Sequence, residues 1–353
     1  MVKRNAGARL VRSLMKAGNA QQKAAVKMVG TLLTLPKSSV RKRPAKKAPA
    51  AAPRVRTPPA TPVAPGRWLA GHHLAGAQQM QYWLYLPQGE VPPKGWPLVL
   101  MLHGCHQTAT QFAQGTRMNQ MAEKKGYAVL YPQQSVTVQA QRCWRWFDRT
   151  TQQGGGDVQP VSGILGKVMS QYPIDRRRVY VCGISAGAGL ANIMALNFPD
   201  VFAAVGLHSG PVFGAGHGTV GALGVMRHGG GLRIEPAIRE VLARRADFPL
   251  MPAVLFQGDA DTVVHAVNQQ QLVRQSLLLN GVPADAPVKV TRRGSRSGHE
   301  IRDYLVGSKV VLRVVRVDTL DHAWSGGDPQ VAFHAKGPDA SRMMLEFFGK
   351  HRR

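Results

Sequence analysis

The sequence has 353 residues, 44% of them hydrophobic, which is enough for one large domain with a sizeable core and an appendage. It carries 46 Lys and Arg against 19 Asp and Glu, a formal net charge of +27. Three cysteines are too few for a disulfide-rich scaffold, and no stretch reaches the roughly 18 apolar residues of a membrane-spanning helix. The sequence therefore excludes a disulfide-rich scaffold and gives no sign of a membrane-spanning helix.

The charge is concentrated in residues 1–66, here called the tail. The tail contains fifteen Lys and Arg, no acidic residue and no aromatic residue, which leaves +12 of the +27 for residues 67–353. From Pro36 onward Pro, Ala, Lys and Arg dominate, and such a segment cannot bury enough apolar surface to offset its ordering entropy. We predict a disordered basic tail.

Residues 20–35 of the tail allow two interpretations. Ala25, Met28 and Leu32 share one helical face beside basic residues, which is typical of a basic amphipathic helix on an anionic surface. The alternative is a solvated chain with transient helicity, because isolated helices of this length are marginal in water.

Basic residues recur so often near the start of the sequence that no uninterrupted apolar stretch reaches the length of a signal peptide. We expect no clear secretion signal, so a cytoplasmic, granule-associated or exported location stays open.

Short apolar runs alternate with longer segments through residues 67–353. The runs predict strands at 81–86, 97–102, 127–131, 179–182, 202–207, 253–256 and 310–317. Strands separated by helix-length segments indicate a mostly parallel sheet with helices on both faces. In such α/β sheets, sites form at the carboxyl ends of the strands.

A Gly-x-Ser-x-Gly motif follows the strand at 179–182. In Gly183-Ile-Ser185-Ala-Gly187 the glycines leave room for a sharp turn that projects the Ser185 hydroxyl clear of the sheet. The amide of Ala186 then lies at a helix N-terminus, where it can bind a developing oxyanion. Ser185 is the candidate nucleophile; the alternative is an ordinary strand-to-helix turn rich in small residues.

The loop after the strand at 97–102 reads His103-Gly-Cys105-His-Gln-Thr. In serine hydrolases of this layout the equivalent loop gives the second oxyanion amide, and we assign this role to Cys105. We expect His103, directly after a buried strand, to be hydrogen-bonded under the loop rather than to act as the catalytic base.

The loops after the last two predicted strands supply an acid and a base. Asp259 and Asp261 follow the strand at 253–256, and His322 follows the strand at 310–317. We choose Asp261 to orient the histidine, because it lies three residues beyond Gly258 and completes the turn; Asp259 would shape that turn. The order serine, aspartate, histidine is that of α/β-hydrolases.

Six blocks resemble one known family. HGCHQT, CWRWF at 143–147, GISAGAG, QGDADTVV, DHAWSGG and GPDASRMMLEFF are similar to blocks of the esterase family of poly(3-hydroxybutyrate) depolymerases, short type. The resemblance spans residues 68–351 and implies a cofactor-free and metal-free hydrolysis of short-chain polyhydroxyalkanoates or similar acyl esters. It implies Ser185, Asp261 and His322 as the triad and Cys105 with Ala186 as the oxyanion hole. Feruloyl and acetylxylan esterases are relatives, so plant-type or small acyl esters are the alternative substrates.

Three features near the site stay open. Trp144, Trp146 and Trp324 are expected to line the substrate site; for Trp144 and Trp146 the alternative is that they pack their loop onto neighbouring helices. Cys105 and Cys143 lie in converging loops and could form a disulfide in an exported protein. The insert at 211–251 is either a lid or a surface excursion.

The competing class is a binding protein in which the tail holds nucleic acid, a membrane face or an anionic granule surface. The histidines lack the spacing of metal ligands, so we assign no metal, and no cofactor motif is present. The sequence does not give the oligomeric state.

Overall fold

The computed structural model describes residues 64–76, 78–294 and 298–353. The predicted tail therefore lies almost entirely outside the described residues, and so does its candidate helix at 20–35. The first strand begins at Arg67.

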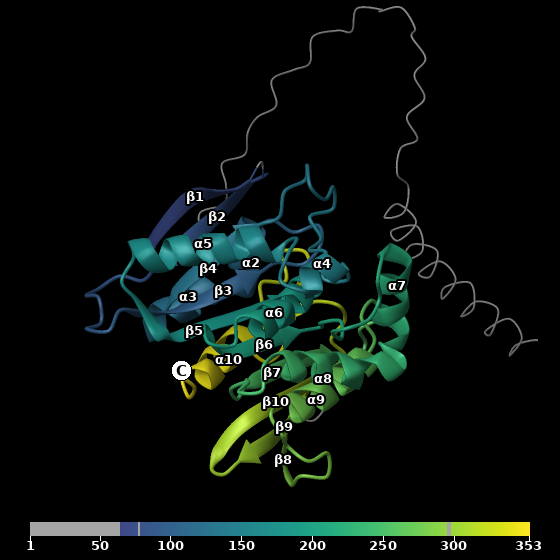
Figure 1. Cartoon of the computed structure of the whole chain (residues 1–353). Coiled ribbons are helices and arrows are strands. Elements are labelled where there is room, and N and C mark those ends of the chain that lie inside the picture. The colour runs from purple at the N-terminus through teal and green to yellow at the C-terminus, as the bar shows by residue number, and fades with distance from the viewer. Residues whose placement is uncertain (1–63, 77, 295–297) are drawn as a thin grey trace, which may run out of the picture. The chain divides into compact units, whose positions relative to one another are not determined.

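One ten-stranded sheet organises the described part of the chain (Figure 1). Its strand order is β1-β2-β4-β3-β5-β6-β7-β10-β9-β8. The strands are β1 (Arg67–Ala75), β2 (Gln78–Leu86), β3 (Trp96–Leu102), β4 (Ala128–Gln133), β5 (Ile174–Ile184), β6 (Phe202–His208), β7 (Ala253–Gly258), β8 (Val288–Arg293), β9 (His299–Val306) and β10 (Lys309–Val317). A separate short pair consists of β11 (Trp324–Ser325) and β12 (His334–Ala335).

The centre of the sheet is parallel and its two edges are antiparallel. β4, β3, β5, β6, β7 and β10 run parallel, whereas the β1–β2 and β8–β9 hairpins pair antiparallel at the edges. Every residue of β3, β4, β6 and β7 is buried. Parallel strands covered on both faces carry continuous apolar runs, which is why the sequence revealed them.

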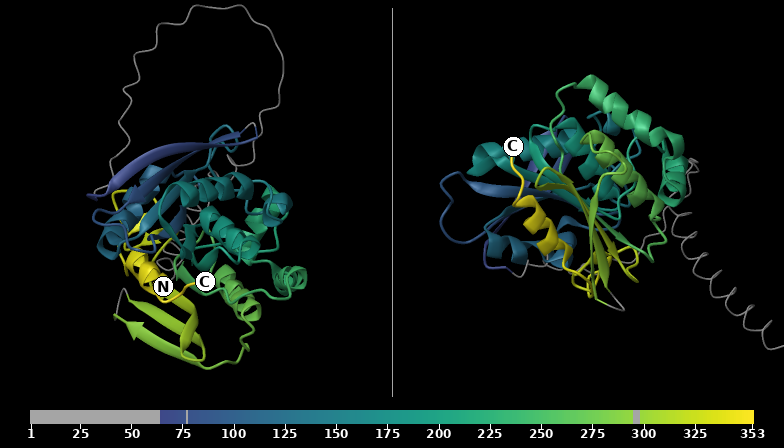
Figure 2. Two further views of the ribbon diagram at one scale, coloured as in Figure 1. Left: turned by 60° about the vertical axis from the view of Figure 1, so that its left-hand side comes forward. Right: turned by 90° about the horizontal axis from the view of Figure 1, so that it is seen from below.

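Helices cover both faces of the sheet (Figure 2). One face carries α2 (Ala109–Thr116), α3 (Met118–Lys125) and α10 (Ala340–Phe348); the other carries α5 (Val158–Gln171), α6 (Ala186–Asn197), α8 (Ile234–Arg244) and α9 (Val267–Leu279). The short α4 (Arg149–Gln152), α7 (Thr219–His228) and the 3₁₀ turn η1 (Gly231–Arg233) complete the described helices. The predicted mostly parallel α/β sheet with two helical layers is confirmed.

Aromatic side chains fill the core on the α10 face. Phe348 of α10 stacks on Tyr180 of β5, with ring centroids 4.9 Å apart, and Phe112 of α2 meets Trp324 edge-on at 5.5 Å. All four side chains are at most 1% exposed. The loop that carries Trp324 is thereby anchored to the core.

The insert between β6 and β7 is held to the N-terminal part of α9. The carbonyl of Met226 in α7 accepts hydrogen bonds from the His265 amide (2.9 Å) and from Asn268 Nδ2 (2.9 Å). Gln271 Oε1 accepts the Gly230 amide at 2.7 Å. These bonds fix the insert in the observed state, and its role as a lid stays a prediction.

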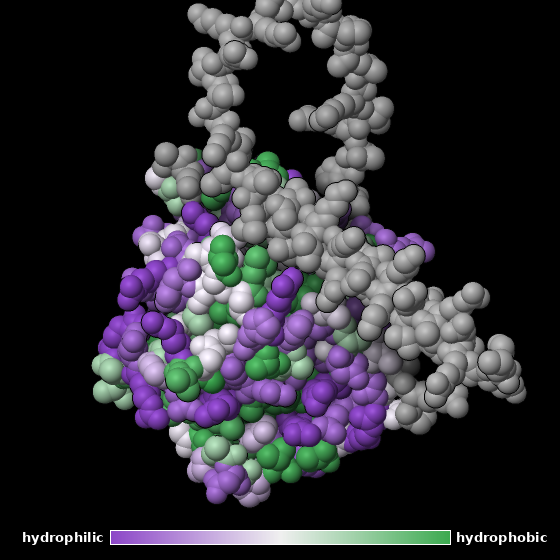
Figure 3. Space-filling model, turned by 90° about the vertical axis from the view of Figure 1, so that its right-hand side faces the viewer, coloured by the Kyte–Doolittle hydropathy of each residue, from purple (hydrophilic) through white to green (hydrophobic). Residues whose placement is uncertain are grey.

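All seven predicted strands are present, but five observed strands were not predicted. β11 and β12 have only two residues each. The residues of β1, β8 and β9 alternate between exposed and partly buried positions or carry many charges, so these strands lack the apolar runs of central strands. The surface is mixed: Figure 3 shows a face on which hydrophilic residues surround separate hydrophobic patches. Among the described residues, no helix is long and apolar enough to cross a membrane.

Candidate active site

Ser185 lies on a strained turn between β5 and α6. Its backbone has φ 56° and ψ −125°, a region that non-glycine residues occupy only where the surroundings enforce it. A Cβ atom at Gly187 would lie 2.1 Å from the Leu102 carbonyl oxygen, and one at Gly183 would lie 2.5 Å from the same atom. Both glycines are therefore required for the turn to pack against the end of β3.

The loops after β7 and β10 bring Asp261 and His322 together. His322 Nδ1 and Asp261 Oδ2 are 2.9 Å apart, and the side chains are 13% and 0% exposed. Burial by itself would raise the pKa of the Asp261 carboxyl, but the hydrogen bond and charge of His322, with the amides of Val264 and Val263, hold this pKa below its ordinary value. Asp261 is thus an ionised acceptor that can hold His322 with its proton on Nδ1.

Asp259 has a different task. Its Oδ1 accepts the amide of Thr319 at 2.5 Å, and its backbone amide donates to the Val317 carbonyl at 3.1 Å. Asp259 therefore ties the loop after β7 to the end of β10. This geometry supports the choice of Asp261 over Asp259 as the partner of His322.

His208, at the end of β6, links the serine turn to the histidine loop. Its carbonyl accepts the Ser185 amide at 3.0 Å, and its Nε2 accepts the Ser325 amide at 3.1 Å. The imidazole is fully buried between Phe256 and Trp324. Burial lowers the pKa of His208 to about 3, helped by the charge of His322, so this side chain is neutral.

The buried histidines predict that stability falls in mild acid. In the unfolded chain they take up a proton near pH 6.5, whereas the folded-state pKa is about 4 for His103 and about 3 for His208, in both cases lowered mainly by burial. The contribution of these histidines to the free energy of unfolding is therefore complete above pH 6.5 and is lost as the pH falls toward 4. The loss is on the order of 3 kcal/mol for each histidine at the acid end. Denaturant unfolding between pH 7.5 and 4.5 measures this slope.

The His208→Gln variant is the control for that slope. A glutamine side chain has no titratable proton, so the unfolding free energy of this variant should depend less steeply on pH than that of the native sequence. An unfolding free energy of the native sequence that is flat from pH 7 to 4.5 would contradict the burial of neutral histidines.

The loop at residues 103–108, here called the oxyanion loop, lies against Ser185. A Cβ atom at Gly104 would lie 3.5 Å from Ser185 Cβ and 3.4 Å from Ile184 Cγ2. Within the described residues no acceptor takes the Cys105 amide, and the amide of Ala186, first in α6, has no acceptor within its own helix. Both amides are available to a ligand oxygen.

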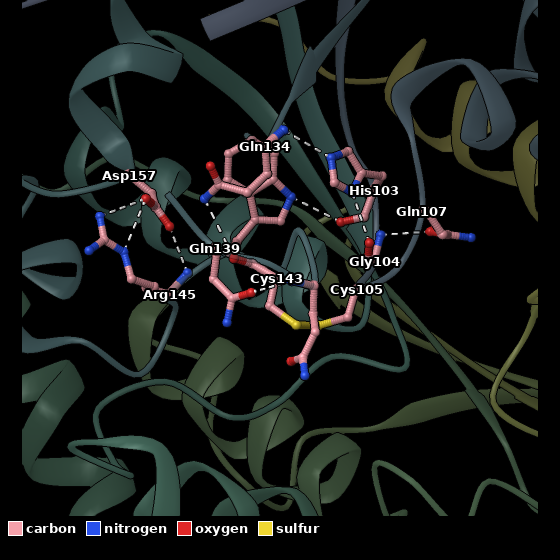
Figure 4. The surroundings of a disulfide bond; sticks show 11 residues. His103, Gly104, Cys105, Gln107, Gln134, Gln139, Cys143, Arg145 and Asp157 are labelled. Carbon is pink, nitrogen blue, oxygen red and sulfur yellow. Dashed lines mark hydrogen bonds and ion pairs between the residues drawn. A yellow bond between two sulfur atoms is a disulfide. The ribbon is translucent and has the colours of Figure 1, made fainter. Parts of the chain in front are cut away.

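A disulfide joins the oxyanion loop to the segment after β4 (Figure 4). Cys105 and Cys143, 38 positions apart in the sequence, are bonded, and Cys182 is free and buried in β5. Next to Cys143, Arg145 forms an ion pair with the buried Asp157 at 3.1 Å, and its amide donates to the same carboxylate at 2.6 Å. The sequence indicated this disulfide only as a possibility, and in the structure the bond is present.

Loss of the disulfide should destabilise the protein. Closing a loop of this size lowers the entropy of the unfolded chain and is worth about 3 to 4 kcal/mol. We expect the Cys105→Ala/Cys143→Ala variant to lose about this much free energy of unfolding in denaturant titrations. Thiol titration of the unreduced, denatured protein should find one thiol, that of Cys182; three thiols would contradict the bond.

The three tryptophans predicted to line the substrate site lie in the interior. Trp144 and Trp324 are 0% exposed and Trp146 is 5% exposed. Trp144 Nε1 donates to the His103 carbonyl at 3.0 Å, and Trp324 Nε1 donates to Ser341 Oγ at 3.2 Å. In this structure Trp144 and Trp324 support the loops from beneath and expose no surface to a substrate. For Trp144 this corresponds to the alternative packing interpretation, whereas for Trp324 it differs from the predicted lining role.

His103 lies under the oxyanion loop, as predicted. It is 0% exposed, its Nδ1 lies 2.8 Å from the Gly104 carbonyl oxygen, and its Nε2 accepts the Gln134 amide at 3.1 Å. The prediction of a hydrogen-bonded histidine under the loop is confirmed. His208 was missed, although its position at the end of a predicted strand is the same signal that identified His103.

Metal binding has no support in the described ranges. Among them, no group of three or more His, Cys, Asp or Glu side chains is arranged to hold a metal ion. The candidate site consists of Ser185, His322, Asp261 and the two free amides.

A mostly parallel sheet with a strained serine turn after β5, an aspartate after β7 and a histidine after β10 defines the α/β-hydrolase class. The sequence model of the family described as Esterase PHB depolymerase matches residues 80–303. The chain belongs to this family. The matched range contains Ser185 and Asp261, and His322 lies beyond it.

Similar proteins include depolymerases and acetylxylan esterases. Poly(3-hydroxyalkanoate) depolymerase C of Paucimonas lemoignei is 29% identical over 220 residues, covering 61% of this chain and 52% of the relative. Poly(3-hydroxybutyrate) depolymerase of Ralstonia pickettii is 30% identical over 166 residues, covering 43% and 34%. Probable acetylxylan esterase A of Aspergillus fumigatus is 34% identical over 130 residues, covering 36% and 34%. The chain thus matches about half of the first relative's length and about a third of the other two.

Solved structures show the same fold. The acetyl xylan esterase from Aspergillus awamori aligns with a TM-score of 0.62 at 20% identity, covering 76% of this chain and 94% of that chain. A Staphylococcus aureus fluorophosphonate-binding serine hydrolase aligns with a TM-score of 0.51 at 13% identity, covering 81% and 99%. At these identities the likeness concerns the fold.

Proposed function

We propose that this protein is a serine carboxylic-ester hydrolase that acts through an acyl-enzyme on Ser185. The observation that carries the proposal is the 2.9 Å hydrogen bond between His322 and the buried Asp261, on the two loops that follow β10 and β7. Ser185 stands on the strained turn that follows β5. The Ala186 amide is next to it in the chain, and Gly104, which precedes Cys105, packs against it.

Each residue has a defined step in this proposal. Asp261 holds the proton of His322 on Nδ1, so Nε2 is the nitrogen free to take the proton of Ser185 Oγ as that oxygen attacks the ester carbonyl. The amides of Cys105 and Ala186 donate to the carbonyl oxygen as it becomes negative. His322 then gives the proton to the leaving alcohol, and water repeats the sequence to release the acid and restore Ser185.

The substrate class we propose is the ester bond of poly(3-hydroxybutyrate), other short-chain polyhydroxyalkanoates or their oligomers. The family match and the names of the Paucimonas lemoignei and Ralstonia pickettii relatives support it. The second candidate is a carboxylesterase for small or plant-type acyl esters, supported by the acetylxylan esterase relatives.

The domain organisation belongs to the same proposal. Residues 67–353 form the catalytic domain, residues 1–66 form a separate basic tail, and the tail attaches the enzyme to an anionic surface such as a granule, a membrane face or nucleic acid. A variant without residues 1–66 should keep the turnover of soluble esters and lose salt-sensitive attachment. Retained attachment would remove the tail from the proposal.

A substrate series tests the function. Initial rates are measured on p-nitrophenyl esters from acetyl to octanoyl, on 3-hydroxybutyrate oligomers, on amorphous polymer and on acetylated xylan, with the native sequence and Ser185→Ala. Serine-dependent release with the highest kcat/KM on hydroxybutyrate oligomers or polymer supports the depolymerase. Serine-dependent release that favours acetylated xylan or simple esters assigns the protein to the second candidate.

A further inference from the structure

Two consecutive peptide groups of the oxyanion loop are held on almost every side. The group between His103 and Gly104 has its carbonyl bonded to Trp144 Nε1 at 3.0 Å and its N–H bonded to Gln107 Oε1 at 2.7 Å. The group between Gly104 and Cys105 has its carbonyl bonded to His103 Nδ1 at 2.8 Å, with the Gln107 amide at 3.4 Å. The N–H of this second group belongs to Cys105, and among the described residues it has no hydrogen-bond acceptor.

The partners of His103 define its tautomer. The Gly104 carbonyl oxygen only accepts, so Nδ1 carries the proton, and the Gln134 amide only donates, so Nε2 is bare. Figure 4 shows the ring between these two partners. Burial, reinforced by the charge of Arg142, lowers the pKa of His103 to about 4, although the Gly104 bond opposes the shift, so the ring stays neutral at physiological pH.

The direction of the Cys105 N–H follows from the direction of the Gly104 carbonyl. A peptide group is planar and trans, so its C=O and N–H point in opposite directions and turn together. A donor that fixes the carbonyl on one side therefore fixes the N–H on the other. That N–H lies one residue after Gly104, where an added Cβ atom would lie 3.5 Å from Ser185 Cβ, so the start of this peptide group is packed beside Ser185.

We propose that His103 is a positioning residue of the oxyanion hole: its Nδ1–H holds the Gly104 carbonyl, so that the Cys105 N–H of the same peptide group is aimed at the oxyanion. The inference rests on the proposed function, in which Cys105 is an oxyanion donor. His103 itself touches no substrate. Trp144 and the Cys105–Cys143 disulfide fix the flanks of the same loop.

Two variants of His103 separate positioning from packing. In His103→Asn the amide nitrogen stands as many bonds from Cβ as Nδ1, so the donor to Gly104 is kept and the acceptor for Gln134 is lost. In His103→Gln the amide oxygen stands as many bonds from Cβ as Nε2, so the acceptor is kept and the donor is lost. Both lose the ring, and both leave one buried backbone group to find another partner.

The donor should decide kcat. We expect His103→Gln to lower kcat about 100-fold with KM changed less than about threefold, since loss of an oxyanion donor costs roughly 100- to 1000-fold. His103→Asn should keep kcat within about fivefold of the native value. The affinity for a phenylboronic acid, whose tetrahedral adduct on serine places an oxygen in the oxyanion hole, should fall in His103→Gln by a factor similar to that of kcat and stay near native in His103→Asn.

Equal losses of kcat in the two folded variants, or a native kcat in His103→Gln, would overturn the proposal; folding is checked by near-ultraviolet circular dichroism. The tautomer provides a test that needs no variant. In native protein labelled with ¹⁵N-histidine, the assigned His103 ring should carry its proton on Nδ1 at pH 7, and a proton on Nε2 would also overturn it. Failure of the proposed function would look different, because turnover would then survive Ser185→Ala.

Discussion

Replacing Ser185 by alanine is expected to lower kcat for ester hydrolysis by about 10⁴- to 10⁶-fold, the range typical of a lost nucleophile in a serine triad. The fold should be retained, because the turn depends on the close packing of Gly183 and Gly187 against β3 and not on the serine hydroxyl. Steady-state rates on a p-nitrophenyl ester, with thermal unfolding as a check, measure both effects.

Ser162→Ala is the matched control for this loss. Ser162 lies in α5 and its hydroxyl donates to the Gln159 carbonyl at the surface. The control should keep native kcat. Substantial turnover in folded Ser185→Ala would remove Ser185 as the nucleophile.

Asp261→Asn is expected to lower kcat by about 10⁴-fold with a small effect on KM. An asparagine can present its NH₂ to His322 and so favour the wrong tautomer, with the proton on Nε2 where the serine proton must be received. The lost carboxylate charge also no longer stabilises the imidazolium that forms during attack. Rates measured across pH with the same ester give the size of the effect.

Asp259→Asn separates the two aspartates of this loop. Its amide oxygen can still accept the Thr319 amide, so the tie between the loops after β7 and β10 is kept. We expect kcat within about threefold of native. A larger loss in Asp259→Asn than in Asp261→Asn would exchange the roles of the two residues.

The central part of the fold could be predicted because the chain shows its burial directly. β3, β4, β6 and β7 are buried at every residue, so each appears as an apolar run with loops at defined ends. The edge strands β1, β8 and β9 could not be predicted in this way. Lys289, Arg292 and Arg293 of β8 are exposed charges on an edge strand, and in sequence such a segment looks like a loop.

The three candidate catalytic residues could also be predicted from the sequence. Ser185, Asp261 and His322 follow three predicted strands in the order that α/β-hydrolases use, and the structure places the last two in hydrogen-bonding contact. The residues that hold the loops of the site from beneath could not be predicted from the sequence. Trp144 was predicted to touch substrate, but a run of aromatic residues reads the same whether its rings line a cleft or lie beneath a loop.

The disulfide and the bridging role of His208 required three-dimensional information. Cys105 follows β3 and Cys143 lies in the segment after β4, and these neighbouring strands bring the two loops together only once the sheet order is known. His208 joins Ser185 to Ser325 across three strand ends. The sequence indicated the Cys105–Cys143 bond only as one possibility, and the strand-end position of His208 does not show which residues it joins.

Locating a covalent adduct is the most direct test of acyl transfer through Ser185. The native protein is treated with a fluorophosphonate, digested and analysed by peptide mass spectrometry, with Ser185→Ala and Asp261→Asn treated in parallel. We predict one stoichiometric adduct on the peptide that carries Ser185, slow labelling of Asp261→Asn and none of Ser185→Ala. An adduct on another residue, or rapid labelling that survives Ser185→Ala, would contradict it.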